Sequence, residues 1–146
     1  MIFLVHHAEA AEAQIDPQRG LTENGRRHAE RLAHAAAERQ VKPVTIWHSG
    51  KLRARQTAAA FRQSCNPLAE FSAIRGLQPT DPAEWIRDRL LGNQRDVMLV
   101  GHMPNLARVL EILTGAPASF PAHGLVAVEW DGARGCEAWR LRGLAP

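Results

Sequence analysis

Aromatic residues and cysteine are scarce in this chain. Tyrosine is absent, phenylalanine and tryptophan occur four times each, and the two cysteines, Cys65 and Cys136, lie far apart. The core must therefore be built mainly from Leu, Val, Ile and Ala, and widely separated thiols favour a reduced, cytoplasmic protein. The apolar start "MIFLV" is too short for a signal peptide or a membrane span, so we expect no membrane partner.

Charge of one sign is also limited. The net charge is +3, and no basic run is interleaved with aromatic residues, which argues against nucleic acid as a partner while leaving room for an anionic ligand. With 146 residues, 45% hydrophobic and 23% charged, the composition is that of a folded protein. We expect a single domain over residues 1–146.

Short apolar runs alternate with helical patterns along the chain. Strands are predicted over 1–5, 44–47 and 96–100, helices over 23–39, 51–63, 83–91 and from Pro104 to Gly115, and a hairpin over 125–142. This alternation predicts an α/β fold, a three-layer α/β/α sandwich with a mostly parallel sheet and a C-terminal antiparallel hairpin at one edge.

Polar residues follow the predicted strands. They are His6, His7 and Glu9 after the first strand, His48, Ser49 and Arg53 after the second, His102 after the third, and Gln78, Thr80 and Asp81 in the loop before the helix at 83–91. Ligands of open α/β sheets bind at the carboxyl ends of the strands, so these side chains should share one site. We expect the remaining histidines, His28, His34 and His123, to be solvated.

Three interpretations fit such a cluster. A metal site is disfavoured because no HxH or HExxH spacing is present and Arg53 lies at the same rim. Phosphoryl transfer to a histidine would need a neutral imidazole nucleophile and donors for the phosphoryl oxygens, roles that Arg53 and His102 fit. The third interpretation is that each histidine merely caps a strand or packs at the surface.

Four segments resemble the histidine phosphatase superfamily, and within it the small bacterial phosphohistidine phosphatases. "VHHAEA" (5–10) corresponds to the opening Arg-His-Gly motif, and "RGLTENG" (19–25) to the element before the first helix. "SGKLRARQTA" (49–58) is similar to Ser-Pro-x-x-Arg-Ala-x-Gln-Thr, and "VGHMPNL" (100–106) to the second histidine segment. The resemblance implies a phosphoglycerate mutase-like fold and a cofactor-free reaction without metal.

The resemblance also implies roles for individual residues. His7 would be the nucleophile, Arg53 would clamp the phosphoryl oxygens, His102 would stabilise the transition state, and Arg19 would be a further phosphate contact. The phosphate-binding residues would then be His6, Arg19, Arg53 and His102. Asp81 and Glu9 are the candidate general acids.

Two departures from the opening motif matter most, since His6 replaces its first arginine and Ala8 replaces its glycine; in the second segment Gly50 replaces the proline. Losing a charge-assisted hydrogen bond to phosphate costs about 1.5–3 kcal/mol. If His6 replaces arginine as a cation, turnover should rise as the pH falls toward about 6.5, the ordinary histidine pKa.

These observations predict a phosphatase that forms a covalent phosphohistidine and acts on protein phosphohistidine, with inorganic phosphate as product. A small-molecule phosphomonoesterase is one alternative. A weakly active or inactive phosphate- or phosphohistidine-binding regulator is the other, since His6 and Ala8 weaken the motif.

Overall fold

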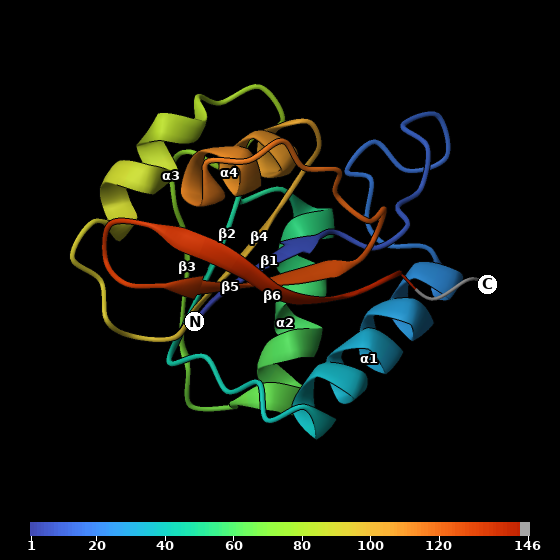
Figure 1. Ribbon diagram of the computed structural model, residues 1–146. Helices are drawn as coiled ribbons and strands as arrows, with labels where there is room; N and C mark the ends of the chain where they lie inside the picture. Colours follow the sequence, from blue (N-terminus) through green and yellow to red (C-terminus); the bar gives the residue numbers. More distant parts are fainter. Residues whose placement is uncertain (144–146) are drawn as a thin grey trace.

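The computed structural model describes residues 1–143, which form a six-stranded sheet flanked by four helices (Figure 1). The strands are β1 (Ile2–His6), β2 (Thr45–His48), β3 (Glu70–Ala73), β4 (Val97–Gly101), β5 (Leu125–Trp130) and β6 (Gly135–Leu141). The helices are α1 (Glu23–Glu38), α2 (Leu52–Cys65), α3 (Ala83–Leu90) and α4 (Asn105–Thr114).

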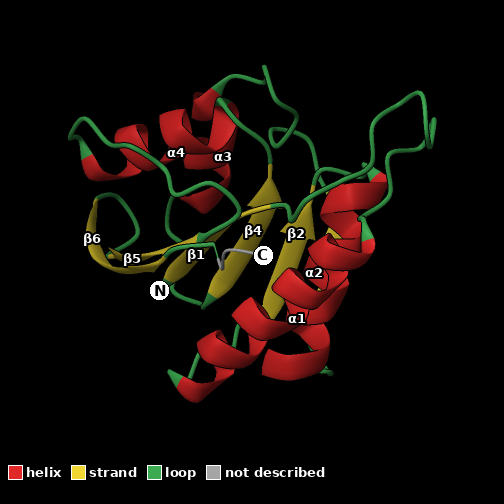
Figure 2. Cartoon of the chain, turned by 90° about the vertical axis from the view of Figure 1, so that its right-hand side faces the viewer, coloured by secondary structure: helices red, strands yellow, loops and turns green. Residues whose placement is uncertain are grey.

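The sheet has the strand order β3-β2-β4-β1-β5-β6. The first four strands of this order run parallel, whereas β5 pairs antiparallel with both β1 and β6. Helices α1 and α2 cover one face and α3 and α4 cover the other (Figure 2). The predicted three-layer α/β fold, with its antiparallel C-terminal pair, is confirmed.

Strand β1 is apolar from Ile2 to Val5 because both of its faces are buried there. Phe3 and Val5 pack with α1 and α2, while Ile2 and Leu4 pack with α3 and α4. Central parallel strands read as continuous apolar runs for this reason. The polar residues that follow β1 therefore lie where the strand leaves the core.

The long helices begin and end where the sequence indicates. At the start of α1, Thr22 Oγ1 accepts a hydrogen bond of 2.9 Å from the Gly25 N–H, as an N-cap residue does. Helix α4 ends at Gly115, whose φ of 71° is in the left-handed region that favours glycine. Within residues 1–143, no helix is both long enough and apolar enough to cross a membrane.

Strand β3 was not predicted. Glu70, Ser72 and Ala73 are exposed, so the segment has no apolar pattern. As an edge strand it needs only the hydrogen-bonding register of β2 beside it, which a sequence pattern does not reveal.

Candidate active site

His6 and His7 stand at the carboxyl end of β1. Alternation along the strand would send these two side chains to opposite faces of the sheet. Because the strand ends here, the two rings meet instead, edge to face, with centroids 4.6 Å apart. The backbone of His7 stays anchored, since its N–H donates to the Gly101 carbonyl at 3.1 Å.

The protonation state of His7 follows from one contact. Its Nδ1 lies 2.7 Å from the carbonyl oxygen of Ala8, an acceptor only, so Nδ1 carries the proton. Burial, with the nearby charge of Arg53, lowers the pKa of His7 to about 4. At neutral pH the ring is therefore neutral, and Nε2 has a free lone pair.

His6 has the opposite tautomer. Its Nδ1 accepts a hydrogen bond of 2.8 Å from the backbone N–H of His123, which leaves the proton on Nε2. Burial, with the neighbouring His7, His123 and Arg53, lowers the pKa of His6 to about 3. The expectation of a cationic His6 that becomes active toward pH 6.5 is therefore wrong.

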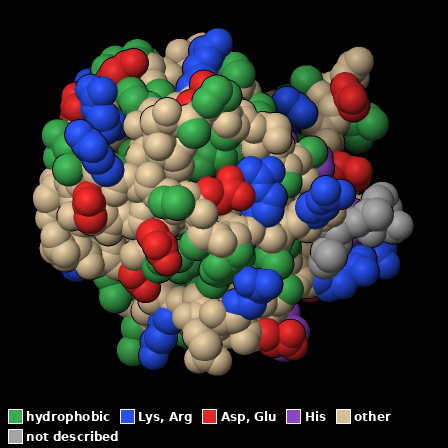
Figure 3. Space-filling view, in the orientation of Figure 1, with side chains coloured by type: hydrophobic (Ala, Val, Ile, Leu, Met, Phe, Trp, Pro, Cys, Tyr) green, Lys and Arg blue, Asp and Glu red, His purple; other side chains and the backbone are tan. Residues whose placement is uncertain are grey.

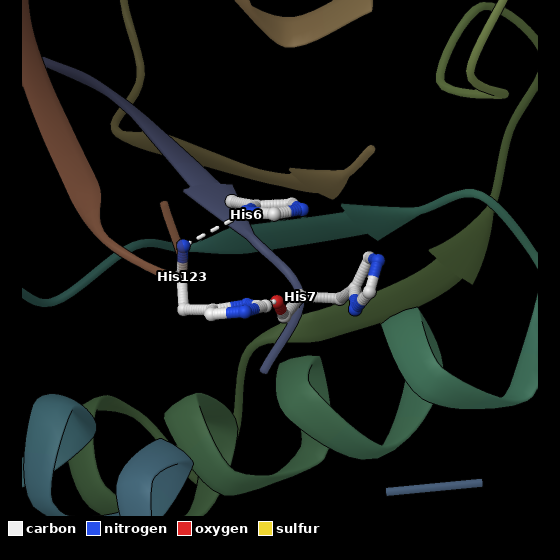
Figure 4. A group of neighbouring side chains, drawn as sticks. All are labelled: His6, His7 and His123. Atoms are coloured by element: carbon white, nitrogen blue, oxygen red, sulfur yellow. Dashed lines mark hydrogen bonds between the residues drawn. The ribbon is translucent and has the colours of Figure 1, made fainter. Parts of the chain in front are cut away.

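His123 joins these two residues, although the sequence predicted it to be solvated. Its ring stacks on His6, with centroids 4.7 Å apart and planes within 5° (Figure 4), and its Nδ1 lies 2.6 Å from the His7 carbonyl. We call His6, His7 and His123 the β1 histidine cluster. The available signal was topological, because a residue just before β5, the antiparallel neighbour of β1, must lie beside the end of β1.

The other two histidines of that group differ from one another. His34 is exposed on α1, as predicted. His28 is buried in α1, contrary to the prediction, and its Nε2 has no hydrogen-bond partner within residues 1–143.

Two donors face the cluster from β4 and α2. His102 follows β4, is 2% exposed, and lies with its ring centroid 5.0 Å from that of His7. Its Nε2 is 2.6 Å from Ser49 Oγ, while its Nδ1 and the Nε of Arg53 are buried without a hydrogen-bond partner in the described part of the chain. We call Arg53 and His102 the donor pair.

The donor pair shares a positively charged environment with Arg19. Burial lowers the pKa of His102 to about 3, helped by the charges of Arg53 and Lys51, and Arg19 likewise acts on His7 and Arg53. The Nε of Arg19 donates to the Ala11 carbonyl at 2.9 Å, which holds that side chain in place. Basic side chains lie along the right-hand side of the molecule, toward which β1 runs (Figure 3).

Thr57 in the "LRARQTA" segment connects α2 to the chain that follows β1. Thr57 Oγ1 accepts the Ala8 N–H at 3.0 Å and donates to the Arg53 carbonyl at 2.8 Å, so it ties the segment after His7 to the first turn of α2. Arg55, two residues from Arg53, is exposed. The structure thus brings His6, His7, Arg19, Arg53 and His102 to one end of the sheet.

The two candidate acids have structural partners. Asp81 Oδ2 accepts the N–H groups of Gly76 and Gln78, both at 3.0 Å, and so shapes the loop before α3. Glu9 Oε1 accepts the hydroxyl of Thr22 at 2.7 Å. Each carboxyl group is therefore engaged in holding a turn.

The β1 histidine cluster also has the composition of a metal site, since one ring nitrogen of each residue lies within 4.8 Å of the others. The contacts do not suit a cation. The Nδ1 lone pair of His6 is used by the His123 N–H, so its Nε2 carries a proton and cannot act as a ligand. The charges of Arg53 and Arg19 would also repel a cation.

The chain matches the family model of the histidine phosphatase superfamily (branch 1) over residues 2–87. The protein belongs to this superfamily. Among solved structures, this superfamily member is 30% identical to a protein from Agrobacterium tumefaciens described as a phosphohistidine phosphatase SixA, with 99% of this chain and 97% of the other covered and a TM-score of 0.82.

More distant structures share the fold of this superfamily member. The protein histidine phosphatase SixA complexed with tungstate is 21% identical, with a TM-score of 0.87 over 97% of this chain and 96% of the other. A phosphoserine phosphatase from Entamoeba histolytica is 13% identical, with a TM-score of 0.72 and 95% of both chains covered. No curated protein matches the chain.

Proposed function

We propose that this protein is a phosphatase that forms a covalent phosphohistidine at His7 and acts on protein phosphohistidine. One observation carries the proposal, namely the bond from His7 Nδ1 to the Ala8 carbonyl. A donor at Nδ1 leaves Nε2 as a nucleophile, and the depressed pKa of His7 keeps it unprotonated at neutral pH.

The reaction would run in two displacements. His7 Nε2 attacks phosphorus, a new N–P bond forms, and the P–N bond to the substrate imidazole breaks with its electron pair going to that imidazole. Water then attacks the phosphorylated His7, breaks the N–P bond, gives up a proton to solvent and releases inorganic phosphate. Dividing one difficult transfer into two easier ones is the advantage of a covalent intermediate.

The donor pair supports the transfer. A phosphoryl group passing between two nitrogens spreads negative charge over its three equatorial oxygens. Arg53 Nε and His102 Nδ1 are both buried and without protein partners in the described chain. Arg53 Nε can donate to those oxygens, and His102 Nδ1 can do so in the tautomer in which His102 Nε2 accepts the Ser49 hydroxyl. Arg19 adds positive charge at the same rim.

The engaged carboxyl groups favour a substrate with a P–N bond. A phosphomonoester needs an acid to protonate its leaving oxygen, whereas a substrate imidazole can take a proton from solvent on its second nitrogen. Glu9 and Asp81, the two candidate acids, are held by hydrogen bonds elsewhere. The 30% identity to the Agrobacterium tumefaciens protein described as a phosphohistidine phosphatase SixA supports the same substrate class.

The proposal is tested by incubation with a ³²P-labelled phosphohistidine peptide. We expect an acid-labile, alkali-stable adduct in the natural protein and in His34→Asn, an exposed histidine that serves as control. His7→Asn should form no adduct and should lose turnover by about 10⁴-fold or more.

Two other results would contradict parts of the proposal. Absence of label with retained binding of inorganic phosphate would identify a phosphate-binding regulator. Faster turnover of p-nitrophenyl phosphate than of the peptide would favour a small-molecule phosphomonoesterase.

A further inference from the structure

His123 stands in a backbone conformation that few side chains adopt. Its φ is 54°, in the left-handed region, although it is not glycine. The loop around it is packed tightly, because a Cβ at Gly124 would overlap the Leu141 carbonyl and a Cβ at Gly143 would overlap the carbonyls of Ala122 and His123. A strained residue in a tightly packed loop indicates that its position serves a purpose.

Two polar groups of His123, its backbone N–H and its Nδ1, are directed at the other two members of the β1 histidine cluster. Its backbone N–H donates to His6 Nδ1 at 2.8 Å, and its Nδ1 lies 2.6 Å from the carbonyl oxygen of His7. A carbonyl oxygen only accepts, so Nδ1 of His123 is the donor there. One residue thus contacts the side chain of His6 and the main chain of the nucleophile.

These contacts determine which end of His6 can donate. A neutral imidazole has one donor and one acceptor nitrogen. With Nδ1 held as acceptor, Nε2 carries the N–H, and Figure 4 shows the rest of the ring extending toward the side where His7 lies. The stacked ring of His123, 4.7 Å away, keeps the His6 ring in that plane.

We propose that His123 is a positioning residue of the phosphate site, which holds His6 as a neutral Nε2–H donor to the phosphoryl group. The inference rests on the proposed function, since it assumes that the ligand at this end of the sheet is a phosphoryl group. In this arrangement His6 binds phosphate through an oriented N–H hydrogen bond and not through a positive charge. A lone pair facing phosphate would repel it, so the tautomer matters for binding.

The test uses His123→Gly, because glycine adopts a φ of 54° freely and keeps the backbone N–H while the ring is removed. His123→Asn is the second variant, since asparagine tolerates the left-handed region and keeps a side-chain donor without a ring. Gln40→Gly is the matched control. Gln40 is exposed at the end of α1 and has a φ of 67°, so this change relieves the same backbone strain away from the site.

The readouts are the ¹⁵N chemical shifts of the His6 ring, the Kd for inorganic phosphate and the KM and kcat for a phosphohistidine peptide. We expect His6 to be Nε2–H in the natural protein and in Gln40→Gly. Both His123 variants keep the backbone N–H that His6 Nδ1 accepts, so they should keep this tautomer while they lose the stacked ring that holds the His6 ring in its plane. The Kd and KM should rise about threefold to tenfold, as for the loss of one hydrogen bond, with a smaller change in kcat.

The outcomes separate this inference from the proposed function. Phosphate affinity within twofold of the natural protein in His123→Gly would overturn the role of the His123 ring even if His7 is labelled, and an Nδ1–H tautomer of His6 in the natural protein would overturn the assignment of its donor. If His7 is never labelled but phosphate affinity falls in both His123 variants, the role of His123 stands and the phosphatase fails. A natural protein that binds no inorganic phosphate would overturn both.

Discussion

The β1 histidine cluster and the donor pair face each other and are built in different ways. In the cluster, one nitrogen of each ring is hydrogen-bonded to the backbone. His6 bonds to the N–H of His123, His7 bonds to the carbonyl of Ala8, and His123 bonds to the carbonyl of His7. In the donor pair, Arg53 Nε and His102 Nδ1 are buried and have no partner within residues 1–143.

Under the proposed function, this difference separates two tasks of a phosphoryl-transfer site. The backbone contacts decide which nitrogens of the cluster carry protons, so His7 would be prepared as the nucleophile before any substrate binds. The donor pair would keep its hydrogen-bonding capacity for the substrate. Donors that need no rearrangement during the reaction are the largest contribution to catalysis in many enzymes.

The largest effect is expected when one member of the donor pair is removed, which tests whether the two groups of residues have different tasks. Arg53→Ala should lower kcat/KM for a phosphohistidine peptide by about a hundredfold or more, because a preplaced donor to the transition state is lost. Arg55→Ala, which removes an exposed arginine two residues after Arg53 on α2, should change kcat/KM less than threefold. Equal losses in the two variants would mean that general positive charge, and not the placement of Arg53, supports the reaction.

A change of pH tests the cluster instead. Because the pKa of His7 is lowered to about 4, its Nε2 stays unprotonated well below neutral pH. We expect kcat/KM, corrected for ionisation of the substrate, to be level from pH 8 to about 5.5 and to fall as the pH approaches 4. A rise in kcat/KM as the pH falls through 6.5 would indicate that His6 acts as a cation after all.

The same groups make the fold sensitive to acid. The pKa values of His6, His7 and His102 are lowered to about 3 to 4, whereas unfolded histidines titrate near 6.5. Below pH 6.5 the unfolded chain binds more protons than the native chain, so the free energy of unfolding decreases as the pH falls toward 4. The loss at pH 5 should be on the order of 1 kcal/mol per histidine in urea titrations.

The smallest effect on turnover is expected when Asp81 is changed, because this candidate acid belongs neither to the β1 histidine cluster nor to the donor pair. Asp81→Asn should lower the free energy of unfolding by about 1 kcal/mol, since it weakens the acceptor for two backbone N–H groups. Its kcat should stay within threefold, as should that of the exposed control Asp88→Asn. A large loss of kcat with unchanged stability would make Asp81 a general acid.

The fold and half of the site could be predicted from sequence because their signals are local. The apolar run of β1 and the Thr22 cap of α1 each depend on a few neighbouring residues. The positions of Arg53 and His102 follow from the rule that side chains after parallel strands meet at one edge. Strand β3 was not predicted because an edge strand can form without an apolar pattern.

The same rule places His6 and His7 at this edge, but the membership of His123 and the arrangement of the three rings could not be derived in this way. The role of His123 depends on a left-handed backbone residue and on hydrogen bonds across more than a hundred residues of chain, from His123 to His6 and His7. The tautomer of His6 depends in turn on that contact. The positive charge expected for His6 was wrong because burial lowers its pKa far below that of a free imidazole and because its Nδ1 accepts a backbone N–H.

Gly25, the last residue of "RGLTENG", has a further consequence for the nucleophile. A Cβ at this position would overlap the carbonyl of Glu9, so the first turn of α1 lies directly against the segment that follows His7. Thr22 closes the contact by donating its N–H to the same carbonyl at 3.1 Å. Loosening of this segment would break its contacts with the start of the 16-residue helix α1, so its local opening is coupled to that of the first turn of α1.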